Sequence, residues 1–528
     1  MLATLDYVVI VLYLLCVAAL GIFMGGRQKN TTDYFLGGRD LPWWAVCFSV
    51  VATETSTLTV ISVPAVAYGG TMTFLQLTLG YFAGRTLVSI LLLPRYFRGS
   101  LVTAYAFLGA RFGNRMRGVA SITFLTTRLL ADGVRLFATA IPIKVVADLA
   151  GLTLFDNPVT YFQIILVLGV ITVVYTLIGG IRAVVWMDVV QMMLYVGGGV
   201  LALVVLMQSA SAGWWTAAAV QGKTAILDLG WGLSLSEMVT QPYVFLSAVV
   251  GGTIFSMASH GTDQIIVQRL LTCRSLADGQ KALIGSSVIV AAQFALFLFV
   301  GLLLWTYYGG VAPEALGLSR ADELFPKFII EGLPPGVSGL VLAGIIAAAM
   351  STLSSSLNSL ASSTMMDLYE RIRKTTLEPR KALSISRGFT LFWAVVFVLF
   401  ASLFRDTTNP VVELGLAIAS FTYGGLLGVF LLGLWNKRAR EMDAVLALLV
   451  SVAVMVLIVF GLWYSPQEGW VFVLGPDAET VTARGLQSIG WPWYTVIGTV
   501  VTLAVGSLLR FRHRDVGLRH ATGEGLTR

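Results

Sequence analysis

The residues best suited to chemistry are hydroxyl side chains within an apolar stretch that is long enough to span a membrane. Residues 339–369 read GLVLAGIIAAAMSTLSSSLNSLASSTMMDLY, and Ser351, Thr352, Ser354 and Ser355 lie within about one helical turn. A simple membrane anchor would carry Leu and Val here, because unsatisfied polar groups in hydrocarbon are costly. Small uncharged oxygens suit weak, reversible binding of a small cation. The patch therefore indicates an ion-coupled membrane transporter.

The composition is that of an integral membrane protein. Mean hydropathy is +0.83 over 528 residues, and 12% of the residues are charged, against about 25% in soluble domains. Apolar runs long enough to cross about 30 Å of hydrocarbon predict an all-α integral membrane protein with about thirteen transmembrane helices. We place these helices near residues 5–25, 43–68, 73–97, 117–149, 159–179, 184–208, 242–260, 282–308, 337–364, 384–404, 411–434, 442–464 and 491–510.

Lys and Arg give the chain a formal net charge of +7, and they gather in alternate loops. Basic loops tend to stay in the cytoplasm, so we predict an outside N-terminus and a cytoplasmic basic tail at 511–528. The charge thus reflects membrane topology and not a nucleic-acid surface. The basic clusters fall at 27–39, 95–117, 269–281, 371–381, 437–440 and 510–519, whereas 150–158 and 465–482 hold no Lys or Arg.

Targeting signals and reactive side chains are sparse. The first apolar stretch carries Asp6 at its start and no basic n-region, so we expect no cleavable signal. Together with the short loops, this favours a bacterial inner membrane. The three Cys and three His are too few and scattered for a disulfide framework or a metal cluster. No nucleophile–base pair indicates an enzyme.

Two predicted spans look interrupted. Residues 43–69 contain the polar sequence ATETST followed by Pro64, and 238–262 contain the loose stretch AVVGGTIFSMASHGT. Discontinuous helices near the bilayer midplane are typical of transporters built from inverted repeats. The two lie five spans apart, which predicts an inverted five-plus-five repeat core with a broken first core helix. We place the repeats at about 43–208 and 238–434, within a transmembrane domain of residues 1–510.

Several motifs together resemble the sodium/solute symporter family, which includes sodium-coupled carriers of sugars, proline, iodide, sialic acid and monocarboxylates. The resemblance covers roughly residues 5–440, with the motifs in the expected order. They are DYFLGGRDLPWW (33–44), ATETST, GGIRAVVWMDVVQ (179–191), GTDQIIVQRLL (261–271), MMDLY (365–369) and GVFLLGLW (428–435).

The resemblance implies a sodium site between the broken helix and the Ser-rich helix. Backbone carbonyls are expected from Ala52, Thr55 and Ala348, and hydroxyls from Ser351 and Thr352. Oxygen donors without charge fit a hard monovalent cation. The alternative is that Ser and Thr at these positions only allow close helix packing.

Some relatives bind a second sodium, and the matching residues here are Asp188, Ser354 and Ser355. An Asp within the membrane is costly unless it is paired, so Asp188 requires a partner. The alternative is an interfacial Asp188 close to Arg182 that binds no ion.

The resemblance places the solute beside the break. Ser56 and Thr59 are expected to face it, with Phe74, Gln76 and Thr78 on the following helix. Sugar-binding residues of the family are not preserved, since the first-helix Gln is replaced by Thr59. Sugar transport is therefore disfavoured.

Charged residues replace the sugar-binding groups. Arg128, Asp132 and Arg135 are spaced i, i+4 and i+7, on one face of a helix. Asp132 can neutralise one arginine only, and Arg135 would suit bidentate binding of a substrate carboxylate. Alternatively, Arg128–Asp132 is a structural pair and Arg135 pairs with Glu54. Arg85 is another possible counter-ion for Glu54, which could itself hold a substrate amine or a proton.

We therefore hypothesise a sodium-coupled symporter that imports a small organic solute, carboxylate-bearing, by alternating access. Na+ is the coupling ion, with one site and a possible second. Alternatives are proton coupling, an amino-acid or neutral solute, and, from another class, a transporter-like solute sensor. The expected partners are the solute and membrane lipid, without nucleic acid, and the oligomeric state is left open.

Overall fold

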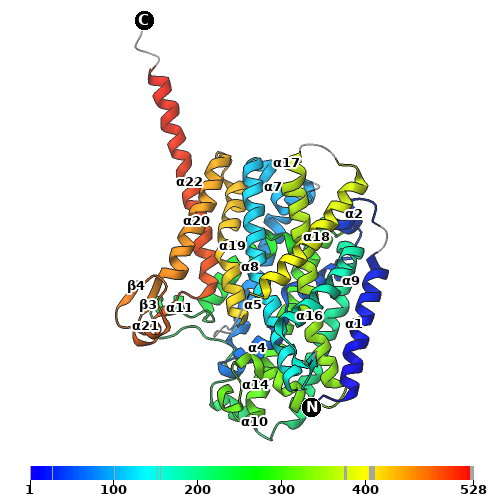
Figure 1. Cartoon of the computed structure of the whole chain (residues 1–528). Coiled ribbons are helices and arrows are strands. Elements are labelled where there is room, and N and C mark those ends of the chain that lie inside the picture. Colours follow the sequence, from blue (N-terminus) through cyan, green and yellow to red (C-terminus); the bar gives the residue numbers. More distant parts are fainter. Residues whose placement is uncertain are drawn as a thin grey trace.

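The computed structural model describes residues 2–25, 28–99, 101–149, 151–154, 156–373, 377–403 and 411–523, without the side chains of 149, 411–417, 478 and 510–523. Helices dominate it, as predicted (Figure 1). They are α1 (Thr4–Gly25), α2 (Thr31–Leu36), α3 (Trp43–Glu54), α4 (Thr57–Gly69), α5 (Leu77–Leu91), α6 (Leu93–Arg98), α7 (Ala104–Arg111), α8 (Asn114–Leu149), α9 (Tyr161–Ser209), α10 (Trp214–Val220), α11 (Leu235–Thr240), α12 (Gly252–Gly261), α13 (Gln264–Leu270), α14 (Leu276–Tyr307), α15 (Leu324–Glu331), α16 (Val337–Ser363), α17 (Glu370–Arg373), α18 (Pro379–Ala401), α19 (Val411–Trp435), α20 (Glu441–Gly461), α21 (Ala478–Ala483) and α22 (Trp491–Gly523).

Short elements connect the helices. Tight 3-10 turns are η1 (Gly37–Arg39), η2 (Thr73–Gln76), η4 (Pro313–Leu316) and η5 (Ala321–Glu323), and π-helical turns are η3 (Ser247–Gly251) and η6 (Thr364–Tyr369). The strands β1 (Thr153–Leu154) and β2 (Asn157–Pro158) pair with each other. A second antiparallel sheet has the order β4-β3-β5, from β3 (Leu462–Ser465), β4 (Gly469–Phe472) and β5 (Gln487–Ser488).

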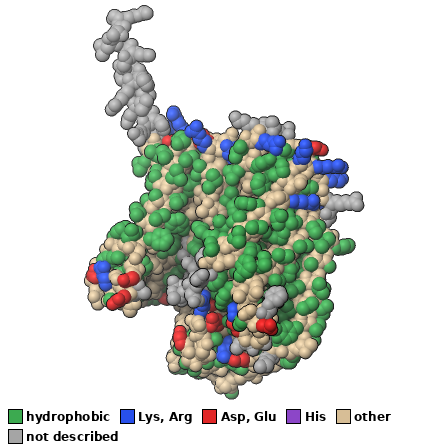
Figure 2. All heavy atoms as spheres, in the orientation of Figure 1, with side chains coloured by type: hydrophobic (Ala, Val, Ile, Leu, Met, Phe, Trp, Pro, Cys, Tyr) green, Lys and Arg blue, Asp and Glu red, His purple; other side chains and the backbone are tan. Residues whose placement is uncertain are grey.

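The helical bundle is built to span a membrane. Within the described residues, nine helices are long and apolar enough to cross a bilayer, or ten if the bent pair α3 and α4 is one span. Apolar side chains cover the middle of the molecule, and Lys and Arg form a row along the end from which α22 projects (Figure 2). The chain is thus a multi-pass integral membrane protein, while the predicted number of about thirteen spans stays a prediction.

The first core helix is broken, as predicted. Helices α3 and α4 are bent by 61°. Thr55, between them, has extended backbone angles, and Ser56 Oγ caps α4 by accepting a 3.3 Å hydrogen bond from the backbone N–H of Leu58. Polar residues stabilise the break because side-chain oxygens satisfy helix-end N–H groups that would otherwise lie bare in hydrocarbon.

The second interruption is also present. The π-helical turn η3 leads into α12, and the helix then stops before α13. Asp263 Oδ1 caps α13, accepting a 2.8 Å hydrogen bond from the backbone N–H of Ile265. The limits of the repeats, about 43–208 and 238–434, stay predictions. The predicted tail, 511–528, continues α22 as helical backbone to Gly523, and 524–528 lie outside the described residues.

The Ser-rich helix α16 lies at the centre of the bundle, and all of its residues from 341 to 363 are buried. Its start is fixed by α1. Asp6 Oδ1 accepts hydrogen bonds from the backbone N–H groups of Gly336 (2.7 Å) and Gly339 (2.8 Å). These groups have no acceptor within their own helix, so the carboxylate satisfies them and complements the helix dipole.

Gly180 kinks the 49-residue helix α9 between the predicted spans 159–179 and 184–208. Its φ of 59° is unfavourable for residues with a Cβ, and an added Cβ would lie 2.8 Å from the carbonyl oxygen of Tyr34. The kink therefore depends on glycine at this position.

We expect Gly180→Ala to lower the free energy of unfolding by about 1–3 kcal/mol, because the left-handed backbone and the contact with Tyr34 both become strained. Denaturant titration of the purified protein measures this. Gly197→Ala in the same helix is the control, since a Cβ there meets no atom within 4 Å. Equal stability of the two variants would contradict the prediction.

Candidate functional site

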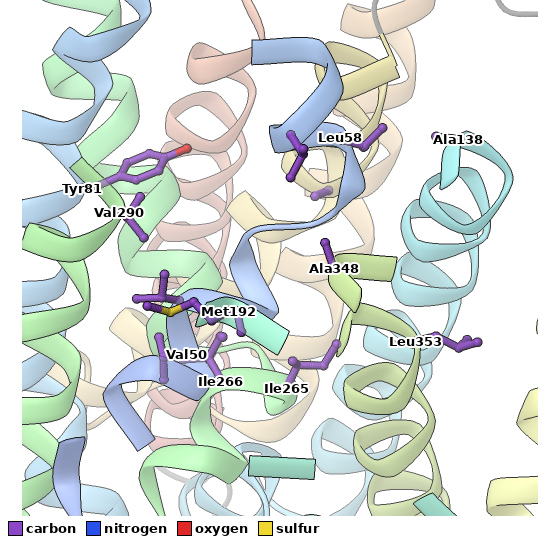
Figure 3. Close-up of a cluster of buried hydrophobic side chains, with 14 of the residues drawn as sticks. Val50, Leu58, Tyr81, Ala138, Met192, Ile265, Ile266, Val290, Ala348 and Leu353 are labelled. Carbon is purple, nitrogen blue, oxygen red and sulfur yellow. The ribbon is translucent and has the colours of Figure 1, made fainter. Parts of the chain in front are cut away.

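The predicted sodium residues meet where α16 passes the break. Ser351 Oγ lies 3.3 Å from the carbonyl oxygen of Ala52, so the two helices touch at this point. Thr352 Oγ1 donates a 3.2 Å hydrogen bond to the carbonyl oxygen of Ala348. Figure 3 shows Ala348 beside the unwound segment between the helices that carry Val50 and Leu58. Thr55 is the buried residue at which α3 ends.

These oxygens could hold a monovalent cation. All five residues are buried, with exposed fractions between 0 and 7%. The Thr352 hydroxyl donates to the carbonyl of Ala348, and a cation would replace this hydrogen bond by an ion–oxygen contact. The single proton of the Ser351 hydroxyl is donated to Asp188 Oδ1 at 2.6 Å, which leaves its oxygen lone pairs, 3.3 Å from the carbonyl oxygen of Ala52, available for the ion. Neutral oxygens on both helices would let the ion bridge α3 and α16 without carrying charge of their own.

Asp188, proposed for a second sodium, forms a buried ion pair with Arg269. Its Oδ2 lies 3.2 Å from Arg269 Nη2 and 2.5 Å from Ser49 Oγ, and its Oδ1 lies 2.6 Å from Ser351 Oγ. The alternative of an interfacial Asp188 beside Arg182 is wrong. Arg182 pairs with the exposed Asp40 instead, at 3.2 Å.

Arg269 also bonds Ser355, another residue of the proposed second site. Ser354 Oγ donates to the carbonyl oxygen of Ser351 at 3.0 Å. The three proposed residues are therefore close together, but a guanidinium already neutralises Asp188 and contacts Ser355. A second sodium at this place would have to displace Arg269, whose role sequence reasoning missed.

A cavity opens beside the break, and five of the predicted solute residues line it. These are Glu54, Ser56, Thr59, Phe74 and Arg135. The other lining residues are Thr53, Leu58, Val63, Tyr81, Arg128, Phe255, Ser259, His260, Ile265, Ile266, Phe294, Thr352, Ser356, Ala419 and Tyr423.

Gln76 and Thr78 do not line the cavity, contrary to the prediction. Gln76 Nε2 donates a 2.8 Å hydrogen bond to the carbonyl oxygen of Tyr243, and Thr78 Oγ1 donates a 2.7 Å bond to that of Leu75. The amide nitrogen of Gln76 and the hydroxyl of Thr78 thus satisfy backbone carbonyls, while Gln76 Oε1 is buried without a hydrogen-bond partner among the described residues. They have no contact with the space in which we place the solute.

The contacts of Glu54 show which arginine is its counter-ion. Its carboxylate forms an ion pair with the fully buried Arg85, and Oε2 lies 3.6 Å from His260 Nε2. The proposed pairing of Arg135 with Glu54 is therefore wrong, and Arg85 is the counter-ion. Because Glu54 is already neutralised, it is a poor binding group for a substrate amine.

The two cavity arginines differ in how fully they are bonded. Arg128 donates from Nε to Asp263 at 2.9 Å and from Nη1 to Asp132 at 3.2 Å, and it also bonds Tyr423. The predicted Arg128–Asp132 pair is thus confirmed. Arg135 Nη1 lies 3.3 Å from Asp132 Oδ1, whereas its Nε is buried and has no hydrogen-bond partner in the part of the chain that the structure describes.

The expected single excess positive charge is not present by simple count. Asp263 pairs with Arg128, so Asp132 is available to balance the charge of Arg135. Although the charges balance, the guanidinium of Arg135 still has hydrogen-bond donors that are not fully used. Arg135 lines the cavity with a side chain that is 14% exposed, and its ion pair with Asp132 is longer than 3 Å, so it can still bind an anion.

Sequence reasoning missed His260 and several aromatic walls of the cavity. His260 Nδ1 lies 2.8 Å from Ser259 Oγ, just before the break that precedes Asp263. The stretch AVVGGTIFSMASHGT, which contains Ser259 and His260, was the sequence feature that could have indicated them. Tyr81 stacks on Phe255 with ring centroids 6.1 Å apart, and Tyr423 borders the same space.

Comparison with known proteins identifies the family. A model of the sodium:solute symporter family matches residues 34–451. The sodium/sialic acid symporter NanT of Aliivibrio fischeri is 28% identical over 514 residues, which cover 96% of this chain and 92% of that protein. The sodium-coupled monocarboxylate transporter 1 of Mus musculus is 29% identical over 547 residues, covering 96% and 86%.

A solved structure has the same fold. It is the substrate-bound outward-open state of a Na+-coupled sialic acid symporter, with a TM-score of 0.80 and 26% sequence identity, and the match covers 96% of this chain and 98% of that one. Because the family model matches most of the chain, this protein belongs to the sodium:solute symporter family, and it is a sodium-coupled transporter and not an enzyme.

Proposed function

We propose that this protein imports a small carboxylate-bearing organic solute together with sodium by alternating access. The observation that carries the proposal is the side chain of Arg135, which borders the cavity beside the broken helix and keeps a donor without a partner. Two of the relatives are named for sialic acid and monocarboxylate transport. Both substrate classes carry a carboxylate, which supports an arginine as the recognising group.

In this proposal one sodium ion lies between α3 and α16. Carbonyl oxygens of Ala52, Thr55 and Ala348 and the hydroxyls of Ser351 and Thr352 would surround it. A second sodium at Asp188, Ser354 and Ser355 is less favoured, because it must compete with the Arg269 guanidinium.

The ion and the solute would be coupled through residues that border both sites. Thr352 belongs to the proposed ion set and also lines the cavity. Thr53 and Ser56, which precede and follow Thr55 in the sequence, line the cavity as well. Sodium that bridges the break to α16 would therefore hold one wall of the solute cavity in place. Coupling follows if sodium and solute favour the same conformation.

The proposed orientation follows the charge at the two ends of the bundle. Lys and Arg form a row at the end from which α22 projects (Figure 2), and this supports a cytoplasmic tail with the start of α1 outside. A bacterial inner membrane is the proposed location. We treat residues 1–510 as a single transport domain.

Ser351→Ala is the direct test of the ion site. We expect the sodium concentration for half-maximal uptake into proteoliposomes to rise about 10- to 100-fold. The variant loses one oxygen contact with the ion, and a polar contact with a charged group contributes about 1.5–3 kcal/mol. Ser359→Ala is the matched control, because Ser359 is a buried serine of α16 that bonds backbone carbonyls of its own helix.

Unchanged sodium dependence in Ser351→Ala would remove the site assignment. Uptake without sodium that responds strongly to pH would instead favour proton coupling. A panel of carboxylates, amino acids and sugars, tested with wild-type protein, identifies the solute class.

A further inference from the structure

A crevice opens at the end of the molecule where the basic residues gather, away from the ion and solute sites. It lies between the start of α8, the turn η6 with α17, and the start of α20. Most of its walls are apolar, and Arg115, Arg371, Asn114 and Asp367 are the polar residues among them. The apolar lining residues are Val119, Ile122, Leu368, Ile372, Met442 and Val445.

The apolar wall faces outward. Ile122 is 55% exposed, Ile372 81% and Met442 46%. In a membrane protein, side chains with such exposure on the transmembrane helices face lipid. We therefore expect the crevice to open to the acyl chains of the bilayer and not only to water.

The two arginines have no fixed counter-ion among the described residues. Arg371 Nη1 makes a 3.5 Å contact with the backbone carbonyl of Asp367, and Arg115 Nη1 lies 3.9 Å from Met442 Sδ. Gly118 leaves room for the Arg371 side chain, because a Cβ at position 118 would lie 3.4 Å from Arg371 Nη1. Both guanidiniums thus have donors available for an anion.

The neighbouring carboxylates are already bonded. Asp367 accepts from Arg117 Nε at 2.7 Å, from Thr103 at 2.6 Å and from Ser363 at 2.8 Å. Glu441 Oε1 caps the start of α8, 2.6 Å from the backbone N of Arg115. Neither carboxylate forms an ion pair with Arg115 or Arg371.

We propose that this crevice binds an anionic phospholipid. Its phosphate would lie with the guanidiniums of Arg115 and Arg371, and its acyl chains would run along the apolar wall formed by Ile122, Ile372 and Met442. Basic pockets between transmembrane helices suit lipid head groups in this way. A soluble anion would use the arginines but gain nothing from the wall, so the lipid is the better occupant.

The test compares two lipids with the same acyl chains. Purified protein in detergent is titrated with phosphatidylglycerol or phosphatidylcholine. Native mass spectrometry counts the bound lipid molecules, and the melting temperature of the protein is measured in parallel. We expect phosphatidylglycerol to bind preferentially to the wild type. Arg115→Gln/Arg371→Gln should weaken that binding roughly 30-fold, from the typical contribution of two basic residues near a membrane surface.

Arg380→Gln/Lys381→Gln is the matched control, because it removes two exposed positive charges at the start of α18, outside the crevice. Ile372→Ser keeps both arginines, so it should weaken the binding of phosphatidylglycerol but not the binding of soluble glycerol phosphate. Equal binding of the two lipids, equal loss in the control pair, or glycerol phosphate binding as tightly as the lipid would each overturn the proposal. Unchanged melting in phosphatidylcholine shows that the variants are folded.

Discussion

Arg269→Gln should lower the free energy of unfolding by about 3–5 kcal/mol, since it leaves a buried carboxylate without its counter-ion. Arg269 and Asp188 are both fully buried, and their side chains are joined at 3.2 Å. Arg269 Nε also donates a 2.9 Å hydrogen bond to Ser49 Oγ on α3. The substitution would therefore loosen the contact of α13 with α3, α9 and α16 at once.

A double variant separates the ion pair from general packing. Asp188→Asn/Arg269→Gln removes both charges, and we expect it to recover about 2 kcal/mol relative to Arg269→Gln. Arg182→Gln is the matched control, because Arg182 pairs with Asp40 at the same 3.2 Å distance on the exposed surface. It should cost less than about 1 kcal/mol. Denaturant titration of the four proteins gives the comparison.

If Arg269→Gln and Arg182→Gln proved equally stable, the buried pair would not hold these helices together. Asp188 would then be free to bind an ion, and a second sodium would become the better explanation of its position. The stability measurement thus also decides how to interpret the proposed second site.

The interruptions of the fold could be predicted because their causes are local. The polar sequence ATETST and Pro64 lie in one apolar stretch, and a break is the local way to satisfy the freed backbone groups. The Arg128–Asp132 pair was likewise predictable, because residues four apart share a helix face.

Pairs between helices could not be predicted in this way. Asp188 is 81 positions from Arg269, and Arg128 is 135 positions from Asp263. Spacing along the chain says nothing about which helices are neighbours. As a result, the sequence suggested an arginine in excess at the cavity, whereas the structure supplies Asp263 from another helix.

The misplacement of Gln76 has a different cause. Phe74 and Gln76 lie in the 3-10 turn η2, which has about 3.0 residues per turn instead of about 3.6. Side chains in such a turn point in other directions than they would in the helix on which the resemblance placed both residues. Phe74 therefore reaches the cavity while Gln76 turns to Tyr243.

Arg135→Ala should raise the KM for a carboxylate substrate about 10- to 100-fold while leaving the protein folded. A charge-assisted hydrogen bond contributes about 1.5–3 kcal/mol, and bidentate binding would use the donor that now has no partner. Arg135 is joined to the structure by one 3.3 Å ion pair and Asp132 keeps Arg128, so we expect a small loss of stability. Initial rates of uptake at saturating sodium measure the KM.

Two variants and one substrate analogue make this test specific. Arg135→Lys keeps the charge without the planar fork, so its KM should lie between those of the wild type and Arg135→Ala. Lys144→Ala is the control on the same helix, because Lys144 pairs with the exposed Asp148. The amide of the same solute lacks the carboxylate charge and should lose little in Arg135→Ala. If the carboxylate and its amide were affected equally, Arg135 would be a structural residue of the cavity and the solute would be recognised by other groups.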